Sequence, residues 1–303
     1  MERQFKGGFG GRLSYVGSRS SGLNYLLAIN KPQPSLIPFV ASRRPYQQFV
    51  SASLDQHDGK GKYDSLQVAV QKRSGGLILD AHYTLSNNLL NYLNLENPYN
   101  HLMWNRDAYN ARHSFVATAA YDLPFGKHRT HMRGAAPAVN AVLGDWQVSW
   151  ITYLQSGQYF SPSYSGSDPS NTNTSGGLPN CIADGNLPNG QRSANRWFNP
   201  GAFTVPLPGT FGNCGVNILE GPGLKLQHFS ATKQFALTEK VHFILQTNIT
   251  NLFNTPHFDF PFANISVPAQ VARVYQLRDT GGNPGGREMS GPRQVEFRFR
   301  VEF

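Results

Sequence analysis

The two cysteines of this chain are its clearest candidates for covalent or metal chemistry, and their spacing leaves three outcomes open. Cys181 and Cys214 both fall in a connection over residues 157–222 that is rich in Asn, Gly, Pro and Ser. They can form a disulfide in an oxidising compartment, share a metal ion, or remain two free thiols. No Cys-x-x-Cys pattern or neighbouring histidine supports zinc. The compartment in which the protein matures decides between the other two.

Two short runs hold the other candidates for metal or acid–base chemistry. His128 and His131 could share a metal ion on a helix, but the basic run 127–133 repels cations, and we expect a turn that faces anionic lipid head groups. The run D-Q-H-D at 55–58 lies in a Gly- and Lys-rich stretch and predicts a turn. The sequence has no Gly-x-Ser-x-Gly, His-Glu-x-x-His or phosphate-loop motif. We therefore expect no enzyme, no metal and no cofactor.

Four aromatic side chains in long polar connections are candidate ligand contacts. Trp104, Tyr109, Trp197 and Phe198 could bind a ligand by stacking. The alternative is that they pack within the loops or belong to an interfacial girdle. We prefer the second interpretation for the group as a whole.

The composition indicates the kind of structure that must position these residues. The 303 residues are 39% hydrophobic and 15% charged, and no apolar run approaches the ~18 residues that a membrane helix needs. This excludes a helical membrane protein, and the aromatic content of 12% argues against disorder. The 30 glycines and 20 prolines favour an all-β chain with long loops. The net charge is +9, but the basic residues are scattered along the chain, so we expect no nucleic-acid partner.

The last eleven residues, R-Q-V-E-F-R-F-R-V-E-F, alternate between an apolar and an ionised face. The polar face carries Gln294, Glu296, Arg298, Arg300 and Glu302, and the apolar face carries Val295, Phe297, Phe299, Val301 and Phe303. A soluble sheet can alternate in this way, but aromatic side chains opposite charged ones suit lipid on one side and a wet lumen on the other. The terminal strand therefore predicts a transmembrane β-barrel with a lipid-facing aromatic row.

Alternation predicts further strands along the chain. The clearest lie at residues 66–71, 77–86, 114–122, 146–155 and 241–250. A weaker one, interrupted by Lys233, lies at 229–235, and fainter ones lie at 9–17 and 47–56. With the terminal strand, we expect about seven to ten antiparallel strands, which form a portion of the barrel.

The connections between these strands are of two kinds. Those after residues 73, 125 and 235 are compact, whereas 87–111, 157–222 and 254–291 are long. Outer-membrane barrels have short periplasmic turns and long extracellular loops. This places Phe303 at the periplasmic end, and the same count places 18–46 there too, unless the count misses a crossing.

Several motifs in a fixed order carry a family resemblance. They are Y-V-G-S-R at 15–19, Y-D-S-L-Q-V at 63–68, Y-D-L-P-F-G-K at 121–127, W-Q-V-S at 146–149, W-F-N-P-G-A-F at 197–203, G-T-F-G-N at 209–213 and N-L-F-N at 251–254. Together with the terminal strand, they resemble the C-terminal half of the barrel of TonB-dependent outer-membrane receptors of the Oar-like group. The resemblance covers nearly the whole chain.

The resemblance implies a barrel of about 22 strands closed by an N-terminal plug. Residues 1–303 then form the C-terminal part of that barrel, without the plug and the first strands. The first residues lack the apolar core of a signal peptide, so either export is lost or the chain is the downstream part of a longer protein. The alternative is a stand-alone small barrel that acts as an adhesive or structural binding module.

The implied setting is the bacterial outer membrane, and it also suggests partners. They are membrane lipid, the assembly machinery through the terminal strand, TonB through the missing N-terminal part, and a ligand that the sequence does not identify. A barrel matures through the oxidising periplasm, so we expect a Cys181–Cys214 disulfide in the long loop.

Overall fold

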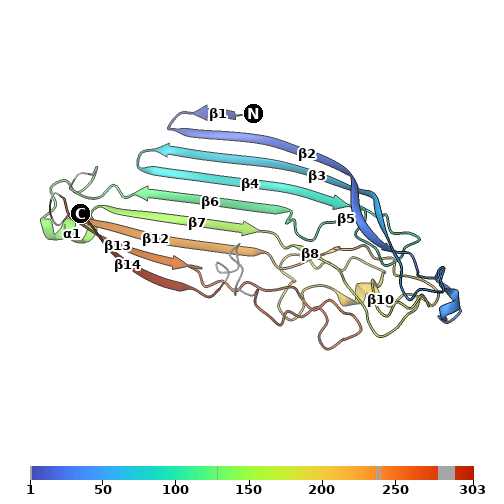
Figure 1. Ribbon diagram of the computed structural model, residues 1–303. Coiled ribbons are helices and arrows are strands. Elements are labelled where there is room, and N and C mark those ends of the chain that lie inside the picture. Colours follow the sequence, from blue (N-terminus) through green and yellow to red (C-terminus); the bar gives the residue numbers. More distant parts are fainter. Residues whose placement is uncertain (1, 128, 237, 239, 279–290) are drawn as a thin grey trace.

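One long antiparallel sheet dominates the computed structural model, which describes residues 2–127, 129–236, 238, 240–278 and 291–303 (Figure 1). The strand order is β1-β2-β3-β4-β6-β7-β12-β13-β14, and β5 pairs with β4 outside this path. The bounds are β1 Glu2–Phe5, β2 Phe9–Ala28, β3 Ser53–Ser74, β4 Leu77–Leu90, β5 Asn105–Arg106, β6 His113–Asp122, β7 Trp146–Gln155, β12 Leu224–Ala236, β13 His242–Thr250 and β14 Gln294–Glu302. All of the ladders are antiparallel, as expected from the alternation.

The two ends of the sheet differ in the length of their connections. At one end lie the turns of β1–β2, β3–β4 and β12–β13 and the 123–145 connection, which holds the helix α1 (Pro137–Leu143). The other end carries the long connections (Figure 1), with the short elements η1 (Ala41–Arg43), β8 (Tyr159–Phe160), β9 (Asn180–Cys181), η2 (Pro200–Ala202), β10 (Phe203–Thr204) and β11 (Leu219–Glu220). We call these the turn end and the loop end. Glu302 pairs with His242, so the C-terminus lies at the turn end, as the parity of the strands predicts.

The register of the ladders gives the sheet one apolar and one polar face. Residues that pair across strands point to the same face. One row on the apolar face runs Leu79, Ala119, Trp150, Phe229, Ile249 and Val295. The adjacent row on the polar face includes Ser149, Ser230, Asn248 and Glu296. The aromatic row of β14 therefore continues an apolar row that runs from β4 to β14, which is the arrangement that lipid requires of a barrel wall.

The N-terminal part of the sheet differs from the sequence-based prediction. The predicted strand at 66–71 and the last four residues of the one predicted at 47–56 belong to one 22-residue strand, β3, which begins at Ser53. The run 55–58 lies within this strand rather than in a turn. The glycine at position 59 suggests a turn in the sequence, but in the structure it lies within β3. A Cβ there would lie 2.5 Å from the backbone oxygen of Leu23. The glycine permits the close approach of β2, whose register shifts between Ser20 and Tyr25. It therefore serves strand packing and not chain reversal.

The merging of these strands also corrects the side of segment 18–46. Residues 18–28 belong to β2, and the connection from 29 to 52 lies at the loop end. The count from sequence had placed this segment at the periplasmic end because it counted β3 as two strands. With one strand removed, short and long connections alternate as they do in outer-membrane barrels.

The sheet is open in the structure. Among the described residues, no pairing joins β1 to β14, and β1 covers β2 only from Phe9 to Arg12. The edge of β2 over residues 14–28 and the outer edge of β14 therefore present backbone groups without a strand partner among the described residues. No helix in the described ranges combines the length and the apolar character needed to cross a bilayer.

Candidate functional site

The cysteine pair lies at the centre of the loop end. Cys181 in β9 pairs in register with Phe203 of β10, and its sulfur is bonded to that of Cys214, with 5.1 Å between the two Cα atoms. The neighbouring asparagines hold the same two segments together. Asn213 Oδ1 accepts the backbone N–H of Cys181 at 2.7 Å, and Asn180 Oδ1 accepts that of Asn213 at 3.0 Å. The bridge thus closes a stretch of 33 residues within the longest connection.

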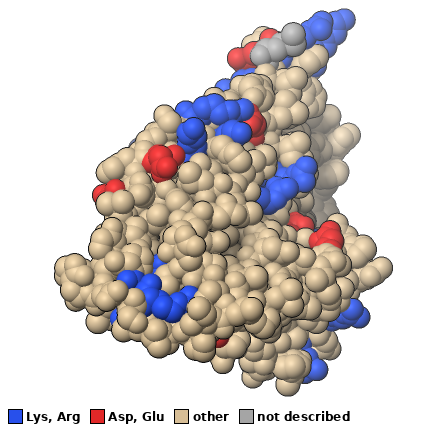
Figure 2. Space-filling model, turned by 90° about the vertical axis from the view of Figure 1, so that its right-hand side faces the viewer, with Lys and Arg blue, Asp and Glu red and all other residues tan. Residues whose placement is uncertain are grey.

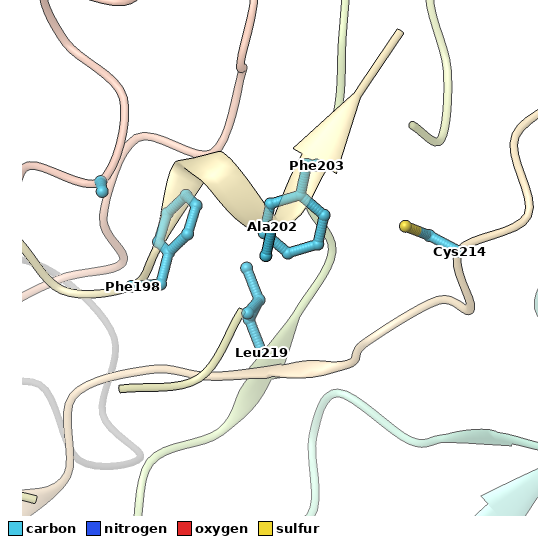
Figure 3. Packing of buried hydrophobic residues seen from close by; sticks show 6 residues of the cluster. Phe198, Ala202, Phe203, Cys214 and Leu219 are labelled. Carbon is cyan, nitrogen blue, oxygen red and sulfur yellow. The ribbon is translucent and has the colours of Figure 1, made fainter. Parts of the chain in front are cut away.

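A small hydrophobic core supports the bridge. Figure 3 shows Phe198, Ala202, Phe203 and Leu219 gathered near Cys214, and Ala272 completes the buried cluster. The ring of Phe198 makes edge contacts with Phe160 at 5.9 Å and with Phe203 at 6.0 Å between centroids. The residues come from the connection between β7 and β12 and from the connection after β13, so the core packs these two loops together at the loop end.

This core separates the four predicted ligand contacts into two pairs. Phe198 is only 1% exposed, so the interpretation of Phe198 as a ligand contact is wrong for this conformation: the ring packs inside the loops. Trp197 is half-buried, and its indole N–H donates to the backbone oxygen of Glu220 at 2.9 Å. Trp104 and Tyr109 are exposed, at 41% and 84%. The ring of Trp104 lies 4.0 Å from Lys62 Nζ. It closes a hollow of about 240 Å³ that also includes Arg19 and Lys60.

Sequence reasoning missed a second hollow at the loop end, of about 340 Å³. Its lining is uncharged: Pro34, Asn94, Asn97, Asn100, Met103, Gly209, Thr210, Phe211, Gly212 and Asn213. Asn94 is 5% exposed, and its Oδ1 is buried without a hydrogen-bond partner in the described part of the chain. A buried acceptor without a partner calls for a donor, which a water or a ligand hydroxyl can supply. The repeated spacing of Asn94, Asn97 and Asn100 is the signal that could have pointed to this site.

The loops also enclose a pair of oppositely charged residues beside the asparagine-lined hollow. Lys31 Nζ donates to the backbone oxygen of Glu96 at 2.9 Å, and Glu96 Oε2 accepts the N–H of Leu178 at 2.7 Å. Burial raises the pKa of Glu96 and lowers that of Lys31, although each charge partly offsets the shift of the other. Burial, with the nearby charges of Glu96 and Asp168, also raises the pKa of Tyr164 to about 12. Lys31, Glu96 and Leu178 belong to three different connections, so these loops meet at a partly buried polar contact.

The structure describes only one of the two histidines that are candidate metal ligands. His128 lies outside the described residues, and the ring of His131 packs against Phe125 at 5.7 Å between centroids. Within the described ranges, no group of three or more His, Cys, Asp or Glu side chains is placed to hold a metal ion. Figure 2, which views the loop end, shows a surface that is mostly neither acidic nor basic. The loop end offers hydrogen-bonding and aromatic groups for binding.

The antiparallel sheet, with one apolar and one polar face, defines the class of protein. It is part of the wall of a transmembrane β-barrel, with long, packed loops on one side of the membrane. The chain belongs to the outer membrane beta barrel domain family, whose model matches residues 1–295. The protein is therefore placed in the bacterial outer membrane. No curated protein and no solved structure matches the chain.

Proposed function

We propose that residues 1–303 are the C-terminal part of the barrel of a TonB-dependent receptor of the Oar-like group. In the complete receptor, the loops capture a ligand at the cell surface, and a plug that precedes these strands gates its uptake across the outer membrane. TonB acts through that upstream part. The assembly machinery binds the terminal strand, and membrane lipid surrounds the apolar face. The chain has no catalytic activity of its own, no cofactor and no nucleic-acid partner.

The observation that carries this proposal is the open sheet. Each unpaired backbone group at the edges of β2 and β14 costs several kcal/mol in hydrocarbon. Residues 14–28 of β2 have no strand partner on the side of β1 among the described residues, although β2 is 20 residues long. Further strands that cover these edges would satisfy their backbone groups, and a larger barrel supplies such strands. The ordered motifs add the Oar-like resemblance.

The loop end favours a neutral ligand that forms hydrogen bonds. The lining of the asparagine-lined hollow has no ionised side chain, and it combines four amides with the ring of Phe211. Such a lining favours groups such as hydroxyls and amides over a free phosphate or carboxylate. The disulfide and the buried core keep the loops packed, which lowers the entropy cost of binding.

The DNA upstream of the codon for Met1 provides the test. An adjoining reading frame that encodes a plug domain supports the receptor. A signal peptide directly before Met1 would instead support the alternative, a stand-alone barrel that acts as an adhesive or structural binding module. Uptake of the captured ligand by the complete receptor should require TonB, and a surface protein that only binds the ligand should be indifferent to TonB.

A further inference from the structure

The turn end carries a basic hollow that the proposed function does not use. It has a volume of about 740 Å³ and lies between the 123–145 connection and the β12–β13 pair. Four basic residues line it, Lys127, Arg129, Arg133 and Lys233, together with a single carboxylate, that of Asp145. A concave site with this excess of positive charge attracts anions.

Lys233 is the buried cation of this hollow. It is 3% exposed, and its Nζ donates to the backbone oxygens of Gly144 and, at 3.4 Å, Asn140. The rings of Trp146 and Phe235 lie 5.4 and 5.0 Å from the Nζ. Carbonyls and rings solvate the ammonium group, but no carboxylate in the described part of the chain forms a salt bridge with it. A buried charge is stable when it is paired, so an anion in the hollow would lower its free energy.

The other three cations leave donors available to such an anion. Arg129 is shared between Asp122, at 3.3 Å, and Asp145, at 3.6 Å. Arg133 donates through Nε to the backbone oxygen of Arg129, which leaves its terminal nitrogens without a bond to any described residue. The side chain of Lys127 is exposed, and no contact of its ammonium group is seen in the described ranges. Arg133 and Lys127 are thus exposed cations in the lining of the hollow, and Lys233 is the buried one.

The surroundings of the hollow are apolar on the lipid side. Lys233 pairs in register with Trp146 on one side and Leu245 on the other, and Leu245 pairs with Phe299 of the lipid-facing row. Next to it, α1 exposes Val139, Val142 and Leu143. An anionic group in the hollow would thus sit where the apolar belt ends, which is the depth of the head groups in the periplasmic leaflet.

We propose that this hollow binds the phosphate group of an anionic phospholipid, with the acyl chains along the apolar face of β12. Phosphate suits the site because arginine and lysine donors converge on it from two segments of the chain. The proposal goes beyond the receptor function and does not depend on it. It requires only the outer-membrane location.

Lipid binding to the protein extracted from outer membranes in detergent and delipidated tests the proposal. Phosphatidylglycerol or phosphatidylcholine is added back, and native mass spectrometry measures the bound lipid. The double variant Lys127→Ser/Arg133→Ser removes two exposed cations without changing the wall. Lys6→Ser/Arg73→Ser is the matched control, because it removes the same charge from other turns at the same end. Heat modifiability of each variant checks that the barrel is assembled.

We expect the wild-type protein to prefer phosphatidylglycerol and the variant Lys127→Ser/Arg133→Ser to bind it about 30-fold more weakly, at about fivefold per cation. The affinity of the control variant for phosphatidylglycerol should stay within about threefold of the wild-type affinity. Equal affinity for both lipids, or equal losses in both variants, would overturn the proposal. Adding excess inorganic phosphate distinguishes a phospholipid head group from free phosphate as the bound group. If it displaces the lipid, free phosphate also occupies the site; if the lipid remains, the acyl chains contribute to binding.

Discussion

Phe299 of β14 stacks on Phe243 of β13, with the ring centroids 6.2 Å apart and the planes inclined by 18°. The two residues are not directly paired, since Phe299 pairs with Leu245 and Phe243 with Val301. The diagonal contact therefore ties two pairs of the apolar face together. It joins the terminal strand to the rest of the lipid-facing surface.

The first prediction concerns the two faces of the terminal strand. Phe299→Arg should destabilise the folded barrel by roughly 2 to 4 kcal/mol, because it loses the stacking and places a charge on the lipid-facing row. Glu296→Arg on the opposite, polar face should cost far less. Denaturant titration of the complete receptor in bilayers gives both values. Equal costs for the two variants would mean that the face of Phe299 does not meet lipid.

The second prediction concerns recognition during assembly. Phe303 is the last residue and is almost fully exposed. We propose that the assembly machinery binds it, so Phe303→Ala should reduce the heat-modifiable fraction in outer membranes. Glu302→Gln, one residue earlier on the polar face, is the control and should assemble normally. Unchanged assembly of Phe303→Ala would count against this role.

The third prediction concerns the disulfide. Closing 33 residues restricts the unfolded chain, and its loss should destabilise the loop layer by roughly 3 to 4 kcal/mol. Cys181→Ser, Cys214→Ser and the double variant should show the same loss of stability, since all three remove the same disulfide bond. Peptide mapping without reductant should find the linked peptides in protein taken from outer membranes. Two freely alkylated thiols there would rule the bridge out.

The fourth prediction follows from Glu96. Burial raises its pKa in the folded state, so between its ordinary value of 4.5 and its folded value the folded state binds more protons than the unfolded state. The stability of the loop layer should therefore increase as the pH falls through this window, and the cost of the buried charge should be greatest above it.

Glu96→Gln tests this sign, because the amide can still accept the N–H of Leu178 but does not ionise. The variant should gain stability relative to wild type at pH 7, and the gain should shrink toward pH 5. Hydrogen exchange of residues 91–100 and 168–178, corrected for the intrinsic effect of pH, measures it. Glu2→Gln at the turn end is the control. A gain that does not change with pH would show that Glu96 is not the titrating group.

The fifth prediction concerns the unpaired edges. If the chain is a receptor fragment, the isolated 303 residues should aggregate or refold poorly in detergent micelles, because backbone groups at the edges of β2 and β14 meet hydrocarbon. A stand-alone barrel would pair these edges with each other. A monodisperse, protease-resistant and heat-modifiable monomer would therefore falsify the receptor assignment and favour the small barrel.

The sequence by itself determined the strands from β4 to β14 that build most of the main sheet, and the faces of these strands. The alternation of Val295, Phe297, Phe299 and Val301 with charged residues is a local property, and it remains valid in the sheet. Lys233 is the informative exception. It weakened the predicted strand at 229–235, yet β12 runs through it from Leu224 to Ala236, because backbone carbonyls of the 123–145 connection receive its ammonium group.

Only the tertiary structure decided whether a glycine-rich stretch turns and what each loop residue contacts. Gly59 is part of a strand because the backbone of Leu23 approaches it, and no local pattern contains that neighbour. The loop contacts join distant residues: Asn171 Nδ2 donates to the oxygen of Ser35 across 136 positions. Burial of Phe198 and exposure of Trp104 follow from such contacts. A side chain's type states what it can bind, but the packing of remote segments determines whether a ligand can reach it.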